Sequence, residues 1–221
     1  VAGFSTLNQP KGMRTNCKIV YLLLMALLCT YTNAKGQQTA DRIDSLVTAL
    51  YHRGQFNGSI LVSVNGKLVY EQARGKANLK TNTDFTPATP CFLASVSKQF
   101  TAMAIMILQE KKLLDYHDPL SKYFPEFPAY GKKVTIENLL THTSGIINYE
   151  QLGIDHPGLT NKEVLSSLVK QPELRFAPGD KYEYSNSGYV LLAMIIEKVS
   201  GLSYADFMKK YIFEPVGMNN T

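Results

Sequence analysis

The sequence predicts a mixed α/β (α+β) fold that runs from a helix through an antiparallel hairpin into a long helical region. Two runs of alternating apolar residues, 59–64 and 67–73, flank Asn65-Gly66, a dipeptide that favours the tight turn of a hairpin. A helical apolar pattern precedes the hairpin. After Asp115 strand signals vanish, and short helical segments separated by proline take over.

The first helix is predicted over TADRIDSLVTALYHRG, residues 39–54, because its apolar residues share one helical face and Gly54 can end it. The hairpin follows. Residues 75–90 are polar and rich in proline, which predicts a loop. The apolar face of the helix consists of Ile43, Leu46, Val47 and Leu50.

Further helices are predicted after this loop. One lies within residues 91–110, and TNKEVLSSLVK opens another with a capping box of Thr160 and Glu163. Residues 188–201 are apolar nearly all round, which predicts a buried helix ended by Gly201. The last helix, within residues 203–215, is ended by Pro215. The helix within 91–110 has a wide apolar face formed by Phe100, Met103, Ala104, Ile107 and Leu108.

The predicted sheet is incomplete. A two-stranded hairpin is only marginally stable alone in water, so we expect further strands to complete it. The sequence reaches Thr221 without supplying them. We therefore interpret the chain as truncated, with residues 35–221 as the N-terminal portion of one domain.

The N-terminal residues have the layout of an export signal. We interpret residues 1–12 as an upstream extension, Met13 as the start and residues 13–34 as a signal peptide with a basic beginning, an apolar centre and small residues before the cleavage point. The alternative is a membrane anchor, but the apolar stretch is short for a bilayer of about 30 Å. This predicts an exported protein, periplasmic or secreted, that begins near Lys35 and has no stable membrane insertion after cleavage.

The net charge and the cysteine content exclude two features, nucleic-acid binding and an internal disulfide. All 18 acidic side chains but only 20 of the 23 basic ones lie after residue 34, a net charge of +2 that gives no case for nucleic-acid binding. Signal cleavage would leave Cys91 as the one cysteine, so the domain has no internal disulfide. Because Cys91 lies in an apolar run, we expect it to be a small buried hydrophobe rather than a nucleophile.

Ser95 and Lys98 are the first candidate catalytic residues. Residues three apart on a helix are neighbours on its surface, so the Lys98 amine can reach the Ser95 hydroxyl. A serine becomes a nucleophile when a base takes its proton, and a neutral lysine can do so. The start of a helix also favours the negative charge that develops on an attacked carbonyl oxygen.

A second candidate group, Tyr184-Ser185-Asn186, lies in a polar turn just before the predicted buried helix. The Tyr184 phenol can carry a proton, and the Asn186 carboxamide can orient a substrate amide. The alternative is an ordinary turn in which the Asn186 side chain caps the backbone.

Three segments together resemble the serine β-lactamase-related family, most of all its class C-like branch with the D-alanyl-D-alanine carboxypeptidases and esterases. They are FLASVSKQFTAMAIMILQEKKLLDYHDPLSKYFPEFP, VTIENLLTHTSGI and FAPGDKYEYSNSGYVLLAMIIEKVSGLSYADFMKKYIFEPVGM. The resemblance implies a β-lactamase/transpeptidase-like fold, with an antiparallel sheet flanked by helices and a helical subdomain. It also implies Ser95 as the acylated nucleophile, Lys98 as its proton acceptor, Tyr184 as the acid/base shuttle and Asn186 as a substrate-binding group.

The family's third motif, K-T-G or H-x-G on a later strand, does not occur before Thr221, which leaves the activity of this chain in doubt. For the full-length protein we expect an exported serine hydrolase that forms an acyl-enzyme with a β-lactam, a peptidoglycan peptide or a small ester. The alternative is a non-catalytic fold relative that binds cell-wall peptide or a partner protein.

The histidines predict no metal site. His52, His117, His142 and His156 show no metal-ligand spacing, and the chemistry that the resemblance implies needs neither metal nor cofactor. For His142, in THTSG, we expect a structural role in holding its turn.

Overall fold

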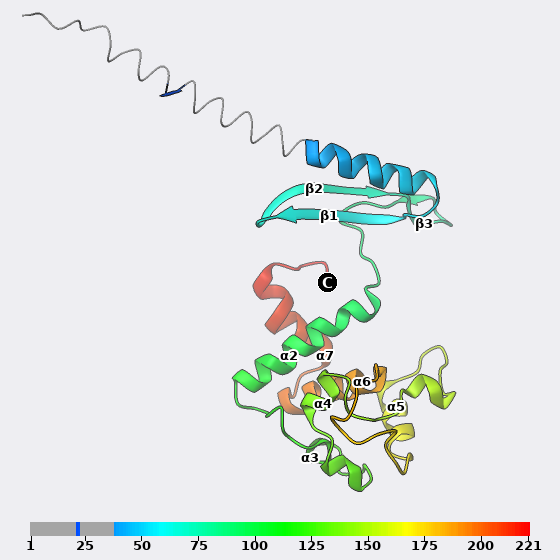
Figure 1. The fold of residues 1–221 in the computed structure, drawn as a ribbon, viewed down its shortest axis with the longest axis vertical. Helices are drawn as coiled ribbons and strands as arrows, with labels where there is room; N and C mark the ends of the chain where they lie inside the picture. The colour runs from blue at the N-terminus through cyan, green and yellow to red at the C-terminus, as the bar shows by residue number, and fades with distance from the viewer. Residues whose placement is uncertain (1–20, 23–37) are drawn as a thin grey trace, which may run out of the picture. The chain divides into compact units, whose positions relative to one another are not determined.

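The computed structural model describes residues 21–22 and 38–221, and the chain divides after Thr89 into two compact units (Figure 1). Nearly all of the predicted signal segment lies outside the described residues, so that prediction stays open. Among the described residues, no helix is long and apolar enough to cross a membrane.

The first unit contains the predicted helix and hairpin. A helix covers residues 38–52, and strands β1 (Gly58–Val64) and β2 (Lys67–Arg74) pair antiparallel with Val64 opposite Lys67. The two turn residues, Asn65 and Gly66, both have positive φ, +51° and +73°, as a two-residue hairpin turn of the type I′ class requires. The hairpin prediction is confirmed.

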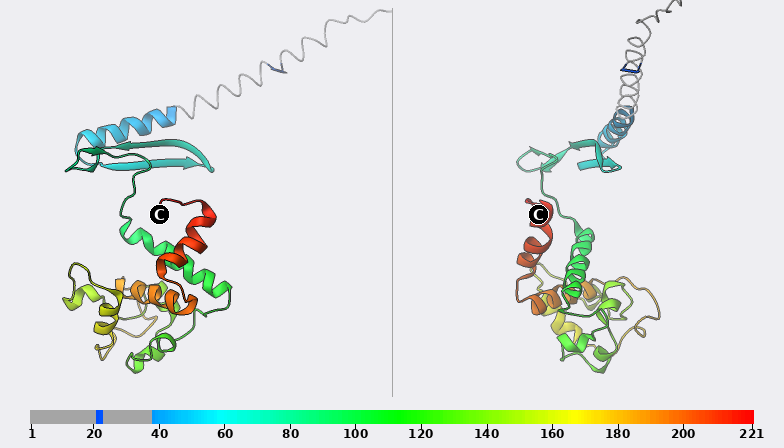
Figure 2. Two further views of the ribbon diagram at one scale, coloured as in Figure 1. Left: turned by 180° about the vertical axis from the view of Figure 1, so that it is seen from behind. Right: turned by 90° about the vertical axis from the view of Figure 1, so that its left-hand side faces the viewer.

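The helix over residues 38–52 lies alongside the hairpin (Figure 2). Val47 and Tyr70 are buried, and the Tyr70 hydroxyl donates a hydrogen bond to Asp44 Oδ1 at 2.7 Å. Arg74 forms an ion pair with the same carboxylate at 2.7 Å. The two contacts of Asp44 fix the helix to β2.

The prediction of a loop over residues 75–90 is wrong in part. A short antiparallel ribbon forms there, from β3 (Lys76–Asn78) and β4 (Thr83–Asp84). An ion pair between Lys76 and Asp84 joins its two strands. These polar residues have no apolar alternation, so periodicity could not reveal the ribbon.

The second unit is helical. Its α-helices are α2 (Lys98–Glu110), α3 (Leu120–Tyr123), α4 (Ile136–Leu140), α5 (Asn161–Leu168), α6 (Asn186–Ser200) and α7 (Tyr204–Met208). Short 3₁₀ turns are η1 (Ala94–Ser97), η2 (Ala129–Lys132), η3 (Tyr149–Leu152) and η5 (Glu214–Val216), and η4 (Lys209–Phe213) is a π-helical turn.

Helix α6 is at the centre of this unit, because it packs against α2, α4, α5 and α7 (Figure 1). The predicted capping box of α5 is present, and Gly201 ends α6 with a φ of +70°. The mixed fold and the buried α6 are confirmed. The large, fully buried side chains include Ile105, Leu108, Phe124, Ile136, Leu139, Leu191, Leu192, Ile195, Ile196 and Phe207.

Three expectations about single residues need correction. Met103 is 46% exposed, since α2 turns Thr101, Ala104, Ile105 and Leu108 inward instead. Cys91 is exposed, and it lies in the irregular stretch at the start of the second unit, ahead of η1. Pro215 does not end the last helix directly: a π-helical turn follows α7, and the proline opens η5.

Gly145 and Gly153 provide a test of the packing around α4. Both have left-handed φ, +72° and +66°, which costs an L residue about 1–2 kcal/mol. At Gly145 a Cβ would also lie 2.2 Å from the carbonyl oxygen of Phe176, whereas at Gly153 it would meet no described atom within 4 Å. Gly145→Ala should therefore lower the free energy of unfolding by a further ~1–3 kcal/mol compared with Gly153→Ala.

Urea unfolding of the two variants beside the wild type measures this difference. Equal losses in the two variants would show that the Phe176 backbone does not approach Gly145.

Candidate active site

Ser95 lies on a tight turn at the entrance to α2. It belongs to η1, and α2 begins three residues later at Lys98. The preceding residue, Ala94, has a φ of +48°, a left-handed conformation that costs a non-glycine residue about 1–2 kcal/mol. The expectation that Ser95 is part of the α-helix itself is thus corrected, because the chain leaves this left-handed residue through a 3₁₀ turn.

The side chains of Lys98 and Tyr184 both reach the Ser95 hydroxyl. Lys98 Nζ donates to Ser95 Oγ at 3.1 Å, and the Tyr184 hydroxyl lies 2.6 Å from the same oxygen. Tyr184 comes two residues before α6 and Lys98 is the first residue of α2, so the packing of these two helices brings the three groups together. Ser95 Oγ therefore has two candidate proton acceptors within hydrogen-bond distance.

Lys98 also changes the acidity of Tyr184. Hydrogen bonding to Lys98, and then to Ser95, lowers the pKa of the Tyr184 phenol below its ordinary value. The ammonium lies over two aromatic rings, with Nζ 5.0 Å from the Tyr184 ring centroid and 5.5 Å from that of Tyr189. A phenol in this setting gives up its proton more easily than a free tyrosine.

Asn186, the first residue of α6, is the fourth member of the group around Ser95. Its Oδ1 accepts a hydrogen bond from Lys98 Nζ at 2.8 Å, and its Nδ2 donates to Glu150 Oε1 at 2.8 Å. Glu150 and its neighbour Asn148 are site residues that the sequence reasoning missed. Asn148 precedes the 3₁₀ turn η3 and Glu150 lies within it, in a segment without periodicity whose one signal is nearness to THTSG.

His142 binds the segment that carries Tyr184 at two points. Its carbonyl oxygen accepts from the Glu183 N–H at 2.9 Å, and its Nδ1 accepts from the Ser185 N–H at 3.2 Å. Its ring packs on the Tyr184 ring with 4.5 Å between centroids. Burial, and then the nearby Lys98 ammonium, lower the pKa of His142, which favours the neutral ring that this Nδ1 contact requires.

Within the part of the chain that the structure describes, no three His, Cys, Asp or Glu side chains gather as a metal site would require.

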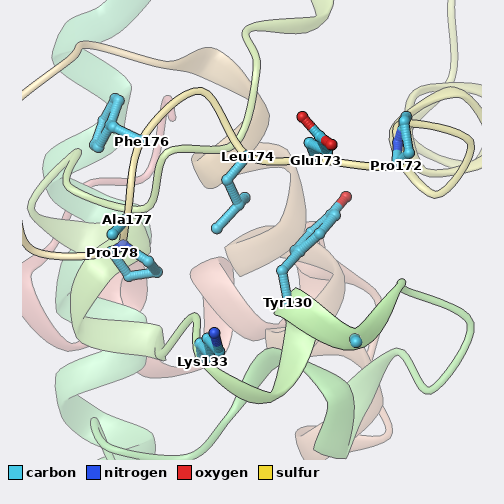
Figure 3. A pocket seen from close by; sticks show the side chains of 9 residues that line it. Tyr130, Lys133, Pro172, Glu173, Leu174, Phe176, Ala177 and Pro178 are labelled. Carbon is cyan, nitrogen blue, oxygen red and sulfur yellow. The ribbon is translucent and has the colours of Figure 1, made fainter.

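A cavity of about 360 Å³ lies elsewhere in the second unit, between η2 and residues 172–178. Figure 3 shows the Tyr130 side chain extending toward the segment of Glu173 and Leu174, and none of the Ser95 group lines this cavity.

The chain is similar to known proteins over most of its length. The family described as Beta-lactamase matches residues 43–221. Penicillin-binding protein 4* of Bacillus subtilis (strain 168) is 40% identical over 196 residues, covering 84% of this chain and 42% of that protein. This chain thus spans less than half the length of that curated relative.

Solved structures show the same fold. The hydrolase EstCE1, which has promiscuous acyltransferase activity, aligns with a TM-score of 0.73 and 25% identity over 82% of this chain and 52% of its own. A class C beta-lactamase aligns with a TM-score of 0.71 and 28% identity, over 83% and 50% of the two chains. This chain therefore belongs to the serine β-lactamase-related family and has its β-lactamase/transpeptidase-like fold.

Proposed function

We propose that the full-length protein is a serine hydrolase that forms an acyl-enzyme on Ser95 with a β-lactam, a peptidoglycan peptide or a small ester. The observation that carries the proposal is the meeting of Lys98 Nζ and the Tyr184 hydroxyl on Ser95 Oγ, at 3.1 and 2.6 Å. Penicillin-binding and β-lactamase names among the relatives support this substrate range.

In the proposed reaction, Lys98 and Tyr184 share the proton transfers around Ser95. Lys98 in its neutral form, or Tyr184 as phenolate, takes the Ser95 proton as Oγ bonds to the substrate carbonyl carbon. The bond from that carbon to the leaving nitrogen or oxygen then breaks as the Tyr184 phenol gives its proton to the leaving group. Where Lys98 took the Ser95 proton, Lys98 passes that proton on to Tyr184. Water attacks the ester on Ser95 by the reverse route, which releases the acid and restores the hydroxyl.

We also propose that the protein acts outside the cytoplasm, in the periplasm or as a secreted protein. The signal-like layout of residues 13–34 supports this location, as does the penicillin-binding name of a relative. The substrates fit it as well, because peptidoglycan lies outside the cell membrane.

Covalent labelling with a fluorescent penicillin or an acylating ester tests the proposed nucleophile. Ser95→Ala in the full-length protein should abolish the label, because the acyl group bonds to Ser95 Oγ. Lys98→Ala should slow labelling by about 10²–10⁴-fold, the usual contribution of positioned proton transfer. Intact-protein mass spectrometry follows the rate of adduct formation.

Ser97→Ala is the matched control, since Ser97 lies on the same exposed turn as Ser95. It should label at nearly the wild-type rate. Full labelling of Ser95→Ala would refute the assignment. A folded wild type that binds the probe without an adduct would favour the non-catalytic alternative.

His142 should make the stability of the protein depend on pH. Because folding lowers its pKa, the unfolded chain binds the proton more tightly. The stability that neutral His142 contributes is therefore present above its ordinary pKa of about 6.5 and is lost as the pH falls through the lower pKa of the folded state. In His142→Asn, the free energy of unfolding should fall less between about pH 7.5 and pH 5 than in the wild type.

Asparagine suits this position, because its Oδ1 can accept from the Ser185 N–H and because it tolerates the φ of +58° at residue 142. Urea unfolding at each pH gives the comparison, with His52→Gln as a control that retains His142. The same pH dependence in His142→Asn as in the wild type would contradict this role.

A further inference from the structure

We propose that Glu150 is a positioning residue for the acylation of Ser95, because its carboxylate fixes the orientation of the Asn186 carboxamide. The inference rests on the proposed function. Its starting point is a continuous chain of hydrogen bonds from Ser95 Oγ through Lys98 Nζ and the Asn186 side chain to Glu150 Oε1, with lengths of 3.1, 2.8 and 2.8 Å.

The two ends of a carboxamide have nearly the same shape but opposite hydrogen-bonding character. The ammonium form of a lysine can only donate hydrogen bonds, and a carboxylate can only accept them. In the observed orientation Asn186 presents oxygen to Lys98 and NH₂ to Glu150, so both contacts are satisfied. The flipped orientation would set two donors against each other at Lys98 and two acceptors against each other at Glu150. Glu150 thus excludes the flip.

Glu150 is itself held in place. Its Oε2 accepts from Asn148 Nδ2 at 2.9 Å, and Asn148 Oδ1 accepts from the Asn186 backbone N–H at 3.2 Å. These contacts close a ring of hydrogen bonds between the start of η3 and the start of α6.

A second pair of hydrogen bonds fastens the same loop to α6. Ser187 Oγ is buried, donates to the Ile147 carbonyl oxygen at 2.8 Å and accepts from the Tyr149 N–H at 2.8 Å. The backbone on both sides of Asn148 is therefore anchored, and the Glu150 carboxylate is presented at a fixed place on the rim of the site.

The orientation of the Asn186 carboxamide determines where the Lys98 amine lies. The Lys98 amine lies between two oxygen acceptors, Ser95 Oγ and Asn186 Oδ1. The contact with Asn186 Oδ1 keeps the amine within hydrogen-bond distance of Ser95 Oγ. If the carboxamide turned, Lys98 would lose this second acceptor and would sample positions away from the nucleophile. Glu150 therefore acts on the proton transfer through Asn186, without contact to the reacting atoms.

Acylation kinetics of the full-length protein test this inference. Glu150→Gln keeps the shape of the side chain, but its own amide can pair with either orientation of Asn186. The first-order acylation rate should fall about tenfold, the loss expected when one hydrogen bond to a charged group is removed. Glu126→Gln, at an exposed carboxylate on the turn after α3, is the matched control and should keep the wild-type rate.

A double-mutant cycle shows whether Glu150 acts through Asn186. In an Asn186→Ala background, Glu150→Gln should change the acylation rate by less than about twofold, because the group that Glu150 orients is gone. A tenfold loss in both backgrounds would overturn the inference, since Glu150 would then act independently of Asn186.

A second readout does not depend on catalysis. The side-chain NH₂ signal of Asn186 in a ¹H–¹⁵N spectrum, assigned by its loss in Asn186→Ala, should shift in Glu150→Gln and stay in place in Glu126→Gln. If the wild type formed no acyl-enzyme but the signal still responded, the proposed reaction would be wrong and the orienting contact would stand. If the Asn186 NH₂ signal stayed in place in Glu150→Gln, the contact between Glu150 and Asn186 would be refuted, whatever the kinetics show.

Discussion

The packing of α2 against α6 is the constraint on which the rest of the site depends. Lys98 is the first residue of α2, and Asn186 is the first residue of α6, with Tyr184 two residues before it. The two chain segments lie more than eighty residues apart in sequence, so only the contact between the helices brings them together. Burial of a large aliphatic side chain contributes about 1.5–3 kcal/mol. Both helices contribute buried apolar side chains to the common core: Ala104, Ile105 and Leu108 on α2, and Leu191, Leu192, Ile195 and Ile196 on α6.

The segment from His142 to Glu150, which runs from the end of α4 into η3, fixes the site side chains more closely than helix packing alone. His142 binds the backbone on both sides of Tyr184 and packs on its ring, while Glu150 binds the carboxamide of Asn186. Gly145, between them, allows the loop to pass against the Phe176 backbone, where no side chain would fit. A loop of this kind can hold side chains within a few tenths of an ångström of a working geometry, because each end of it is bonded to a buried helix.

Local patterns in the sequence predicted the local parts of the structure. The Asn65-Gly66 hairpin, the capping box of α5 and the neighbouring positions of Ser95 and Lys98 all depend on residues a few positions apart. The contact of Glu150 with Asn186 joins residues far apart along the chain, and no short-range pattern signals the left-handed φ of Ala94 or the exposure of Met103. A single acidic residue in a short 3₁₀ turn carries no period or spacing, so no pattern could single out Glu150 before the fold was known.

We propose that this geometry makes Ser95, and no neighbouring group, the nucleophile. Cys91, four residues earlier, provides a demanding internal comparison, since its thiol is exposed and both residues lie in the same tryptic peptide, residues 81–98. Tandem mass spectrometry of that peptide, after incubation of the full-length protein with a penicillin, measures which side chain carries the added mass. The account predicts that the fragment ions place the mass on Ser95. Added mass on Cys91 with Ser95 unmodified would contradict it.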